Sequence, residues 1–314
     1  GLQKLGYDYK DAVNYVVAAC WEFIIPNVGN DIANIGAVNF PKLVDEVLRR
    51  DLPAGKDWDT LLADVKAAIK AECDRITESI HDVWFVPSPF LDLLRDGKKY
   101  NNFGLHGCGI ASAADALAAV REYVYDKQTV TPDRLLHALD TDYADDPELL
   151  HLLRYEAPKM GCDDDRADRL GTLILDAFAD ALDGKKNCLG GIWRAGTGTA
   201  MYYLWYSRDL GATADGRHAG EPFGTNFSPN LFTQVPGPLT DIQSFTKQHI
   251  ERTINGGPLT LEFAAGIFGN PESIQKVAML IRYFIKRGGH QLQLNAVNLE
   301  AMKEAQANPE AYRQ

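Results

Sequence analysis

The chain has 314 residues, of which 46% are hydrophobic, and a formal net charge of −11. This length and composition predict a globular protein with a sizeable core, in one large domain or two ordinary ones, and exclude a disordered chain. The negative charge, which no cluster of Lys and Arg offsets, argues against binding to nucleic acid or to an anionic membrane and favours small-molecule or protein partners.

The cysteines and the lack of long apolar runs predict a cytoplasmic protein. No apolar stretch approaches the roughly 20 residues that a membrane span needs, and no secretory leader is recognisable. The cysteines form no CxxC pair, which indicates reduced thiols rather than a disulfide framework or a zinc site. They are Cys20, Cys73, Cys108, Cys162 and Cys188. The abrupt ends at Gly1 and Gln314 suggest a piece excised from a longer protein.

Residues 18–26 place a thiol and a carboxylate, Cys20 and Glu22, two positions apart in an otherwise apolar run. A carboxylate there loses its solvation without return unless it has a partner or a function. If the segment is extended, both side chains point to the same side and can face one cavity. The alternative is an inert buried cysteine beside a glutamate that reaches solvent or pairs with an arginine. This segment alone leaves both open.

Helices are predicted over the next stretch. Apolar positions recur at three- and four-residue steps from Asp59 to Trp84, which predicts a long amphipathic helix with Cys73 in the core. Alanine content, Thr-Pro and Pro starts, and a terminal glycine predict four more helices. These are expected at 112–124, from 131 onward, at 147–160 and at 164–182. The acidic triplet 163–165 is interpreted as a solvated helix start favoured by the helix dipole, not as a metal site.

Glycines, prolines and aromatic residues concentrate between Gly190 and Gly269, which is typical of functional loops. Within and after this region we expect a strand at 257–263, a helix from Asn270 to Gly288 and a strand at 290–295. The last strand carries Gln291, Gln293 and Asn295 on one face, which would suit the interior of a barrel. Helices alternating with short strands predict an α/β architecture without an internal repeat.

Four segments then occur in a fixed order: Cys20-Trp21-Glu22, GLHGCGIASAADAL at 104–117, TADGRHAGEPFG at 213–224 and GGHQLQLNAV at 288–297. Together they resemble the C-terminal half of the glycyl radical enzymes, the pyruvate formate-lyase-like family. The DGR-x-AGEPFG pattern is the most specific of the four. The resemblance covers nearly all of the chain, and four segments in register carry far more weight than any one of them.

The resemblance implies a fold. The family folds as a ten-stranded α/β barrel made of two five-stranded halves, with surrounding helices and two loops that meet inside. We therefore expect residues 1–314 to be a single-domain fragment, the C-terminal half of the catalytic domain, ending before the glycine radical motif. That motif would follow the segment at 308–313. Because the chain as given lacks that motif, the fragment alone is expected to be inactive.

The resemblance also implies a chemistry and partners. Cys20 matches the loop cysteine, whose thiyl radical would abstract hydrogen from a substrate carbon. The radical is an organic one on a glycine, installed by an activating enzyme that uses S-adenosylmethionine and an iron–sulfur cluster. We expect no metal or other cofactor bound in this chain, a small-molecule substrate, and a homodimer used in anaerobic metabolism.

The neighbours of the thiol discriminate between reactions. Formate acetyltransferase members have tandem cysteines, whereas Ala19 and Trp21 flank Cys20 here. Glu22 matches members that eliminate water, amine or sulfite, and members that decarboxylate arylacetates. A carboxylate in apolar surroundings has a raised pKa and suits proton removal. The leading hypothesis is a dehydratase-type lyase that cleaves C–O, C–N or C–S bonds with Glu22 as base. An arylacetate decarboxylase, a formate acetyltransferase and a radical-less scaffold or regulatory paralogue are the alternatives.

Candidate substrate contacts are harder to assign. Trp21 and Trp193 could line a pocket, or could simply pack in the core. His106 is expected in a glycine-flanked loop, where it could approach a ligand or tie loop backbone together. Arg217, in the DGR turn, is expected to anchor loops through salt bridges rather than to touch substrate. Cys108 is interpreted as a structural thiol.

Overall fold

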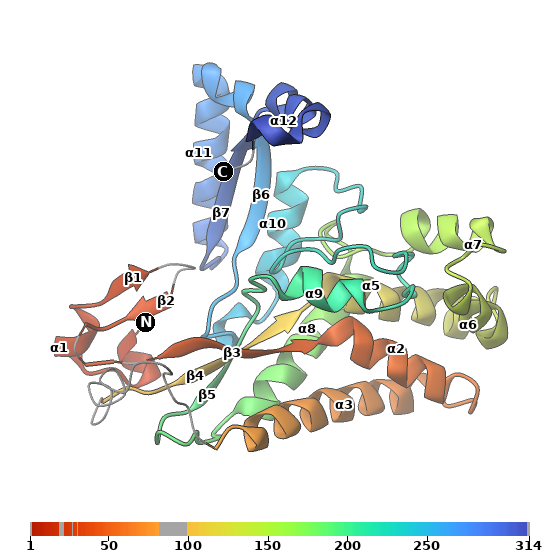
Figure 1. The fold of residues 1–314 in the computed structure, drawn as a ribbon, viewed down its shortest axis with the longest axis horizontal. Coiled ribbons are helices and arrows are strands. Elements are labelled where there is room, and N and C mark those ends of the chain that lie inside the picture. The colour runs from red at the N-terminus through yellow and green to blue at the C-terminus, as the bar shows by residue number, and fades with distance from the viewer. Residues whose placement is uncertain (1, 19–21, 27, 30, 82–98, 313–314) are drawn as a thin grey trace.

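The computed structural model describes residues 2–18, 22–26, 28, 29, 31–81 and 99–312. Strands in this part of the chain form one antiparallel pair, one parallel three-stranded sheet and one parallel pair (Figure 1). In that order they are β1 (Val16–Ala18) and β2 (Glu22–Ile24); β3 (Ile32–Asn39), β4 (Phe103–Cys108) and β5 (Trp193–Gly196); β6 (Leu259–Ala264) and β7 (Leu292–Val297).

Helices connect and cover these strands, and several begin at an Asp, Asn or Thr cap followed by proline. Their bounds are α1 (Tyr9–Ala12), α2 (Phe40–Asp51), α3 (Trp58–Ser79), α5 (Ile110–Val120), α6 (Pro132–Asp140), α7 (Pro147–His151), α8 (Asp165–Leu182), α9 (Tyr202–Arg208), α10 (Pro238–Lys247), α11 (Pro271–Lys286) and α12 (Leu299–Ala307). π-helical turns at Arg121–Asp126 and Leu152–Glu156 extend α5 and α7. The caps satisfy amide groups that the first turn leaves unpaired.

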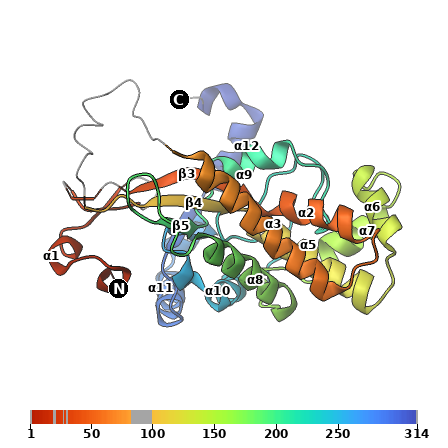
Figure 2. The same ribbon diagram turned by 90° about the horizontal axis from the view of Figure 1, so that it is seen from below.

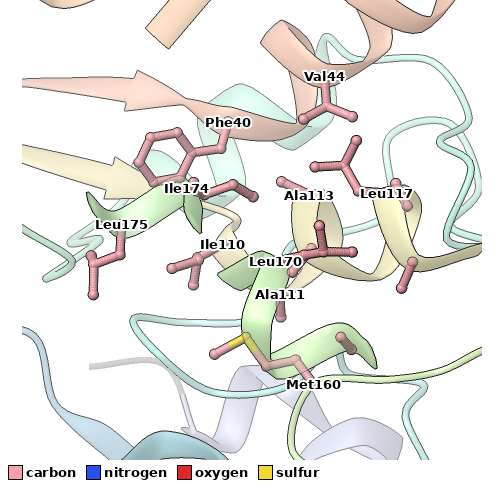
Figure 3. Packing of buried hydrophobic residues seen from close by; sticks show 14 of the residues in the cluster. Phe40, Val44, Ile110, Ala111, Ala113, Leu117, Met160, Leu170, Ile174 and Leu175 are labelled. Atoms are coloured by element: carbon pink, nitrogen blue, oxygen red, sulfur yellow. The ribbon is translucent and has the colours of Figure 1, made fainter. Parts of the chain in front are cut away.

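The parallel sheet β3-β4-β5 is the centre of the larger body. Every residue of β4 is buried, as expected for the middle strand of a parallel sheet. Helices α3 and α8 pack side by side on one face of this sheet (Figure 2). Helices α2, α5 and α8 enclose the adjoining core, in which all eleven residues of α5 are buried. Figure 3 shows this packing, with Phe40, Val44, Ile110, Ala113, Leu117, Leu170 and Ile174 among its members.

The pair β6-β7, with α11 and α12, stands out from that body (Figure 1). The chain reaches it along the edge of β5. The amide of Asn255 donates to the Ala195 carbonyl at 3.0 Å, and the amide of Thr197 donates to the Gly256 carbonyl at 2.8 Å. Hydrogen bonding thus passes from β3 through β5 to residues 255–256, and the same segment continues into β6. The α/β class is confirmed.

The predicted helices are present with shifted ends. Helix α3 stops at Ser79, because Ile80 is extended, and the predicted end at Trp84 lies outside the described residues. The helix expected at 147–160 ends at Glu156, since Ala157 precedes a proline and is held in an extended conformation. Cys73 is fully buried in the core, as predicted. In the acidic triplet, Asp164 caps α8, and its neighbours on both sides pair with Lys247.

One expectation for the middle of the chain was wrong. His106 lies in strand β4, not in a loop, because the glycines around it pack against the core and against Asn255. The region 190–269 contains β5, α9 and α10 in addition to β6, the strand predicted at 257–263. Some of its glycines, such as Gly196 and Gly216, pack closely against other segments, whereas others, such as Gly211 and Gly237, meet nothing within 4 Å.

Candidate active site

An open cavity of about 1040 Å³ lies against the central sheet, on the face opposite α3 and α8. Its walls come from the start of β3, from β4 and β5, and from residues 198–200, 225–226, 250–258 and 288–293. Its polar lining residues include amide, imidazole and guanidinium groups: His106, Arg194, Asn226, Asn255, Gln291 and Gln293. Two of the three amides predicted on one face of the last strand, Gln291 and Gln293, therefore border this cavity, whereas Asn295 is not among its lining residues.

Strand register explains which side chains reach this cavity. Gly104 pairs with Arg194, and His106 pairs with Gly196, on the adjacent strands β4 and β5. Side chains alternate between the two faces of a strand, so these four residues share one face. The residues between them face the core: Phe103, Leu105, Trp193 and Ala195. His106 and Arg194 thus lie on the cavity side at diagonal positions, and Gly104 and Gly196 occupy the other two positions.

Asn255 fills the hollow that the two glycines leave. A Cβ on Gly104 would lie 2.1 Å from Asn255 Nδ2, and one on Gly196 would lie 2.9 Å from Asn255 Cβ. The Asn255 carboxamide donates from Nδ2 to the carbonyl of Ala33 in β3, at 2.8 Å. Its side chain therefore lies across all three strands, between His106 and Arg194.

His106 is buried and electrically neutral. Burial lowers the pKa of its imidazole to about 4, against a smaller opposing effect of its hydrogen bond to the Ala33 backbone. Nδ1 is buried and has no partner among the described residues. Gly198 covers the ring, and a Cβ there would lie 3.1 Å from Cε1. A histidine in this state can donate or accept a hydrogen bond but carries no charge at neutral pH.

Arg194 is held by an ion pair. Its Nη1 donates to Asp31 Oδ2 at 3.1 Å and to the Tyr7 hydroxyl at 2.7 Å. Asp31 also accepts from Tyr7, at 2.9 Å, and from the backbone and side chain of Asn102, at 2.8 and 2.9 Å. Burial is the main cause that raises the pKa of Tyr7 to about 12, so this hydroxyl stays protonated.

Two reciprocal contacts tie the cavity walls together. The Thr199 amide donates to Asn226 Oδ1 at 2.9 Å, and the Asn226 amide donates to Thr199 Oγ1 at 3.2 Å. Ser228 Oγ donates to the Thr260 carbonyl and accepts from the Thr260 amide, both at 3.2 Å. These bonds join the segment after β5 to the segment after the DGR motif and to β6.

The arginine of the DGR motif stabilises its own turn by hydrogen bonds to backbone carbonyls. Arg217 is fully buried and donates to the carbonyls of Glu221, at 2.8 Å, and of Gly211. Its Nε donates to Thr213 Oγ1 at 3.1 Å. The expected salt bridges are thus replaced by hydrogen bonds to carbonyls and a hydroxyl, because the side chain folds back into its own turn. Arg217 does not line the cavity.

A buried polar network supports the same turn. Asn230 Nδ2 donates to Asp115 at 3.0 Å and to Asp215 at 3.1 Å. Lys159 donates to the carbonyl of Asp215 at 2.9 Å. Burial raises the pKa of Asp115 to about 7, and it lowers the pKa of Lys159. The network joins α5 to the DGR turn by way of Asn230, four residues after the cavity residue Asn226.

The thiols at Cys73, Cys108 and Cys162 are not activated. Burial raises the pKa to about 12 for Cys73 and Cys108, and to about 11 for Cys162. These three stay protonated at neutral pH, which agrees with a structural role. The described residues contain no group of three or more His, Cys, Asp or Glu that could hold a metal ion. They also form no helix long and apolar enough to cross a membrane.

Of the described residues predicted for the site, only His106 is seen to border the cavity. Cys20 and Trp21 lie outside the described residues, and Glu22 is described only as the first residue of β2, paired with Ala18. His106 borders the cavity. Trp193 is in the core, edge-on to Phe103 with ring centroids 5.3 Å apart, and does not line the cavity.

Sequence reasoning missed Arg194 and Asn255. A signal for Arg194 was present, because Trp-Arg-Ala-Gly alternates apolar and polar like a strand. No local pattern marks Asn255, which reaches the site only through tertiary packing on two glycines from other strands.

The family described as Pyruvate formate lyase-like matches residues 88–207, and the family described as Glycine radical matches residues 223–314. Trans-4-hydroxy-L-proline dehydratase of Clostridioides difficile is 30% identical over 71% of this chain and 28% of its own length. (2S)-3-sulfopropanediol dehydratase of Klebsiella oxytoca is 24% identical over 100% of this chain and 42% of its own length. These matches decide the family. The chain belongs to the pyruvate formate-lyase-like glycyl radical enzymes.

A solved structure agrees on the fold. The glycerol-bound form of the B12-independent glycerol dehydratase from Clostridium butyricum superposes with a TM-score of 0.87 at 24% identity, over 99% of this chain and 43% of that one. This glycyl radical enzyme chain thus spans less than half the length of each relative named here. The α/β fold of this chain is thus that of the matched part of this structure.

Proposed function

We propose that the full protein is a glycyl radical lyase of the dehydratase kind. The observation that carries this is the sequence Cys20-Trp21-Glu22, whose glutamate is the first residue of β2, in a chain of this family. Relatives named for dehydration of hydroxyproline and of sulfopropanediol support elimination of water from a small hydroxylated compound. The cavity, which has His106 and several amide side chains on its wall, suits such a compound, with His106 as a hydrogen-bonding contact.

In this proposal the radical glycine lies in a following segment, is installed by a radical-generating activase, and supplies the one-electron oxidation of Cys20. The Cys20 thiyl takes a hydrogen atom from the substrate carbon that bears a hydroxyl group, which leaves a thiol and a carbon radical. Glu22 takes the hydroxyl proton, and the neighbouring carbon releases its leaving group with the bonding electron pair. That group takes the proton from Glu22, and the product radical recovers a hydrogen atom from Cys20. A homodimer and the complete ten-stranded barrel belong to the same proposal.

The test is Glu22→Gln in the activated full-length protein, with Glu46→Gln on the surface of α2 as a matched control. Substrates named in the relatives, trans-4-hydroxy-L-proline, (2S)-3-sulfopropanediol and glycerol, form the first panel. We expect turnover to fall at least a hundredfold in Glu22→Gln, while the glycyl radical signal in electron paramagnetic resonance and the activity of Glu46→Gln stay at wild-type levels. Retained turnover in Glu22→Gln would refute the assignment.

The alternatives give different results. An arylacetate decarboxylase, which carries the same Cys20 and Glu22 pair, would release carbon dioxide from an arylacetate. A radical-less scaffold would have a stop codon directly after Gln314, whereas the enzyme requires a glycine radical motif there. Acyl transfer to coenzyme A is the least favoured, because Ala19 precedes Cys20 where a second cysteine would be needed.

A further inference from the structure

The guanidinium of Arg194 has more donors than partners. Its side chain is 10% exposed, and both hydrogen bonds that it makes to described residues come from Nη1. Nε is buried and without a partner among the described residues. Because a guanidinium carries five N–H donors, the Nε and Nη2 edge is unused. A buried donor without an acceptor is costly, so this edge calls for one.

Asp31 does not supply that acceptor. Its carboxylate already accepts four hydrogen bonds: from Arg194 and Tyr7 on one oxygen, and from the backbone and side chain of Asn102 on the other. The pair is thereby fixed in place, with Asp31 fully occupied. Since Arg194 lines the cavity, a molecule bound there can supply the remaining acceptor.

We propose that the Nε and Nη2 edge of Arg194 is a subsite for an oxyanion group of the substrate, a carboxylate or a sulfonate. This inference rests on the proposed function and narrows its substrate to a small hydroxy acid. The edge presents two parallel N–H groups in a plane, which matches two oxygens of such a group. A single hydroxyl oxygen can meet both only at bent angles, without the two parallel hydrogen bonds that a carboxylate or sulfonate makes.

The neighbourhood fits that occupant. Lys4 also lines the cavity, together with the carboxylates of Glu251 and of Asp31, the partner of Arg194, whereas His106 is neutral and adds no charge. Asn255 packs between His106 and Arg194, and its Nδ2 is committed to Ala33, so its carboxamide fixes the floor beside the subsite. The substrate's oxyanion would thus lie at the Arg194 end of the floor, and its hydroxyl-bearing carbon farther along the cavity.

The test measures binding to the full-length protein without its radical, by titration calorimetry. The probes are two size-matched pairs: 2-hydroxyethanesulfonate with ethane-1,2-diol, and 3-hydroxypropanoate with propane-1,3-diol. We expect at least one acid to bind at least tenfold more tightly than its diol. Arg194→Gln should weaken that binding at least tenfold, and Arg194→Lys should restore it only in part, because an ammonium has no fork. Arg208→Gln, at an exposed position, should bind within twofold of wild type.

The inference is overturned if neither acid binds more tightly than its diol, or if Arg194→Gln leaves acid binding unchanged. If the Arg194 variants do not fold, the comparison of probes on wild-type protein still overturns the inference whenever neither acid is preferred over its diol. The result is separable from the proposed reaction, since binding needs no radical. Turnover of a neutral diol without acid binding would keep the dehydratase and remove this subsite. Acid binding without turnover would keep this subsite and remove the dehydratase assignment.

Discussion

Gly216 lies directly against the backbone of Arg154. A Cβ at Gly216 would be 2.6 Å from the N and Cα atoms of Arg154, and the φ of Gly216 is +86°. The Arg154 side chain also binds the turn that contains Gly216. It donates to the Gly216 carbonyl at 2.7 Å and to both Glu221 carboxylate oxygens at 2.8 and 2.6 Å. The glycine of the DGR motif is thus required by close packing as well as by backbone conformation.

Replacing Gly216 by alanine separates these two requirements when it is compared with Gly220→Ala. Gly220 also has a positive φ, +73°, but its Cβ would meet only the Arg208 carbonyl at 3.7 Å. We expect Gly220→Ala to lower the free energy of unfolding by about 1–2 kcal/mol. Gly216→Ala should cost roughly 2 kcal/mol more, because backbone atoms cannot move aside. Chemical denaturation checks this, and equal losses would contradict the packing argument.

Gly104→Ala should push the Asn255 side chain off the cavity floor. The new Cβ would collide with Nδ2 at 2.1 Å and break the bond to the Ala33 carbonyl, at a cost of about 1–3 kcal/mol in unfolding free energy. Gly266→Ala, whose Cβ would meet nothing within 4 Å, is the control. In the double variant Gly104→Ala with Asn255→Ala, the collision disappears. Strictly additive losses in that double variant would show that Asn255 is not the colliding group.

Asp115 should make stability depend on pH. Its pKa is about 7 in the folded protein, raised by burial from 3.8, so between these values the folded state binds more protons than the unfolded state. The stabilising contribution is therefore present at low pH and is lost as pH rises toward 7, on the order of 1 kcal/mol per pH unit. Denaturation of wild type and Asp115→Asn from pH 4.5 to 8 tests this. Lys159 and Asp215 face the same carboxyl, and their variants should alter the slope.

A pH-independent gap between wild type and Asp115→Asn would contradict a raised pKa at Asp115. A gap that moves the opposite way, with wild type gaining stability as pH rises, would indicate a carboxyl that is ionised and paired in the fold. Either result would remove the Asp115 side of the network from this account.

His106 should stay neutral throughout the physiological range. Because burial lowers its pKa to about 4, its imidazole resonances in nuclear magnetic resonance should not shift between pH 8 and pH 5.5. Assignment is made by comparing spectra of wild type and His106→Gln, with free imidazole as an internal reference. A midpoint near the ordinary value of about 6.5 would mean that the ring is solvated or paired with an anion.

Much of the helical part of the fold follows from sequence, because caps and apolar periodicity act locally. Asn270 and Thr131 begin helices where the pattern predicts, and Gly288 ends one. The central strands cannot be predicted from sequence in the same way. Strand β4 reads as a loop because its two inner glycines are needed for neighbours far away in the chain, namely Asn255 and Phe40.

The site is predictable only in part for the same reason. His106 stands out as a histidine among glycines, and resemblance singles out Cys20 and Glu22. Trp193 and Arg194 are adjacent, and only the strand register decides which of them faces the cavity. The orientation of the Arg194 guanidinium depends on its hydrogen bonds to Asp31 and Tyr7, and no sequence pattern connects these residues to Arg194.

In the proposed function, Cys20 carries the unpaired electron to the substrate. The most direct measurement compares wild type and Cys20→Ala in the activated full-length protein, following the glycyl radical by electron paramagnetic resonance and product formation by mass spectrometry. We expect Cys20→Ala to retain the radical signal and form no product. Product formation at more than a hundredth of the wild-type rate in Cys20→Ala would contradict the claim.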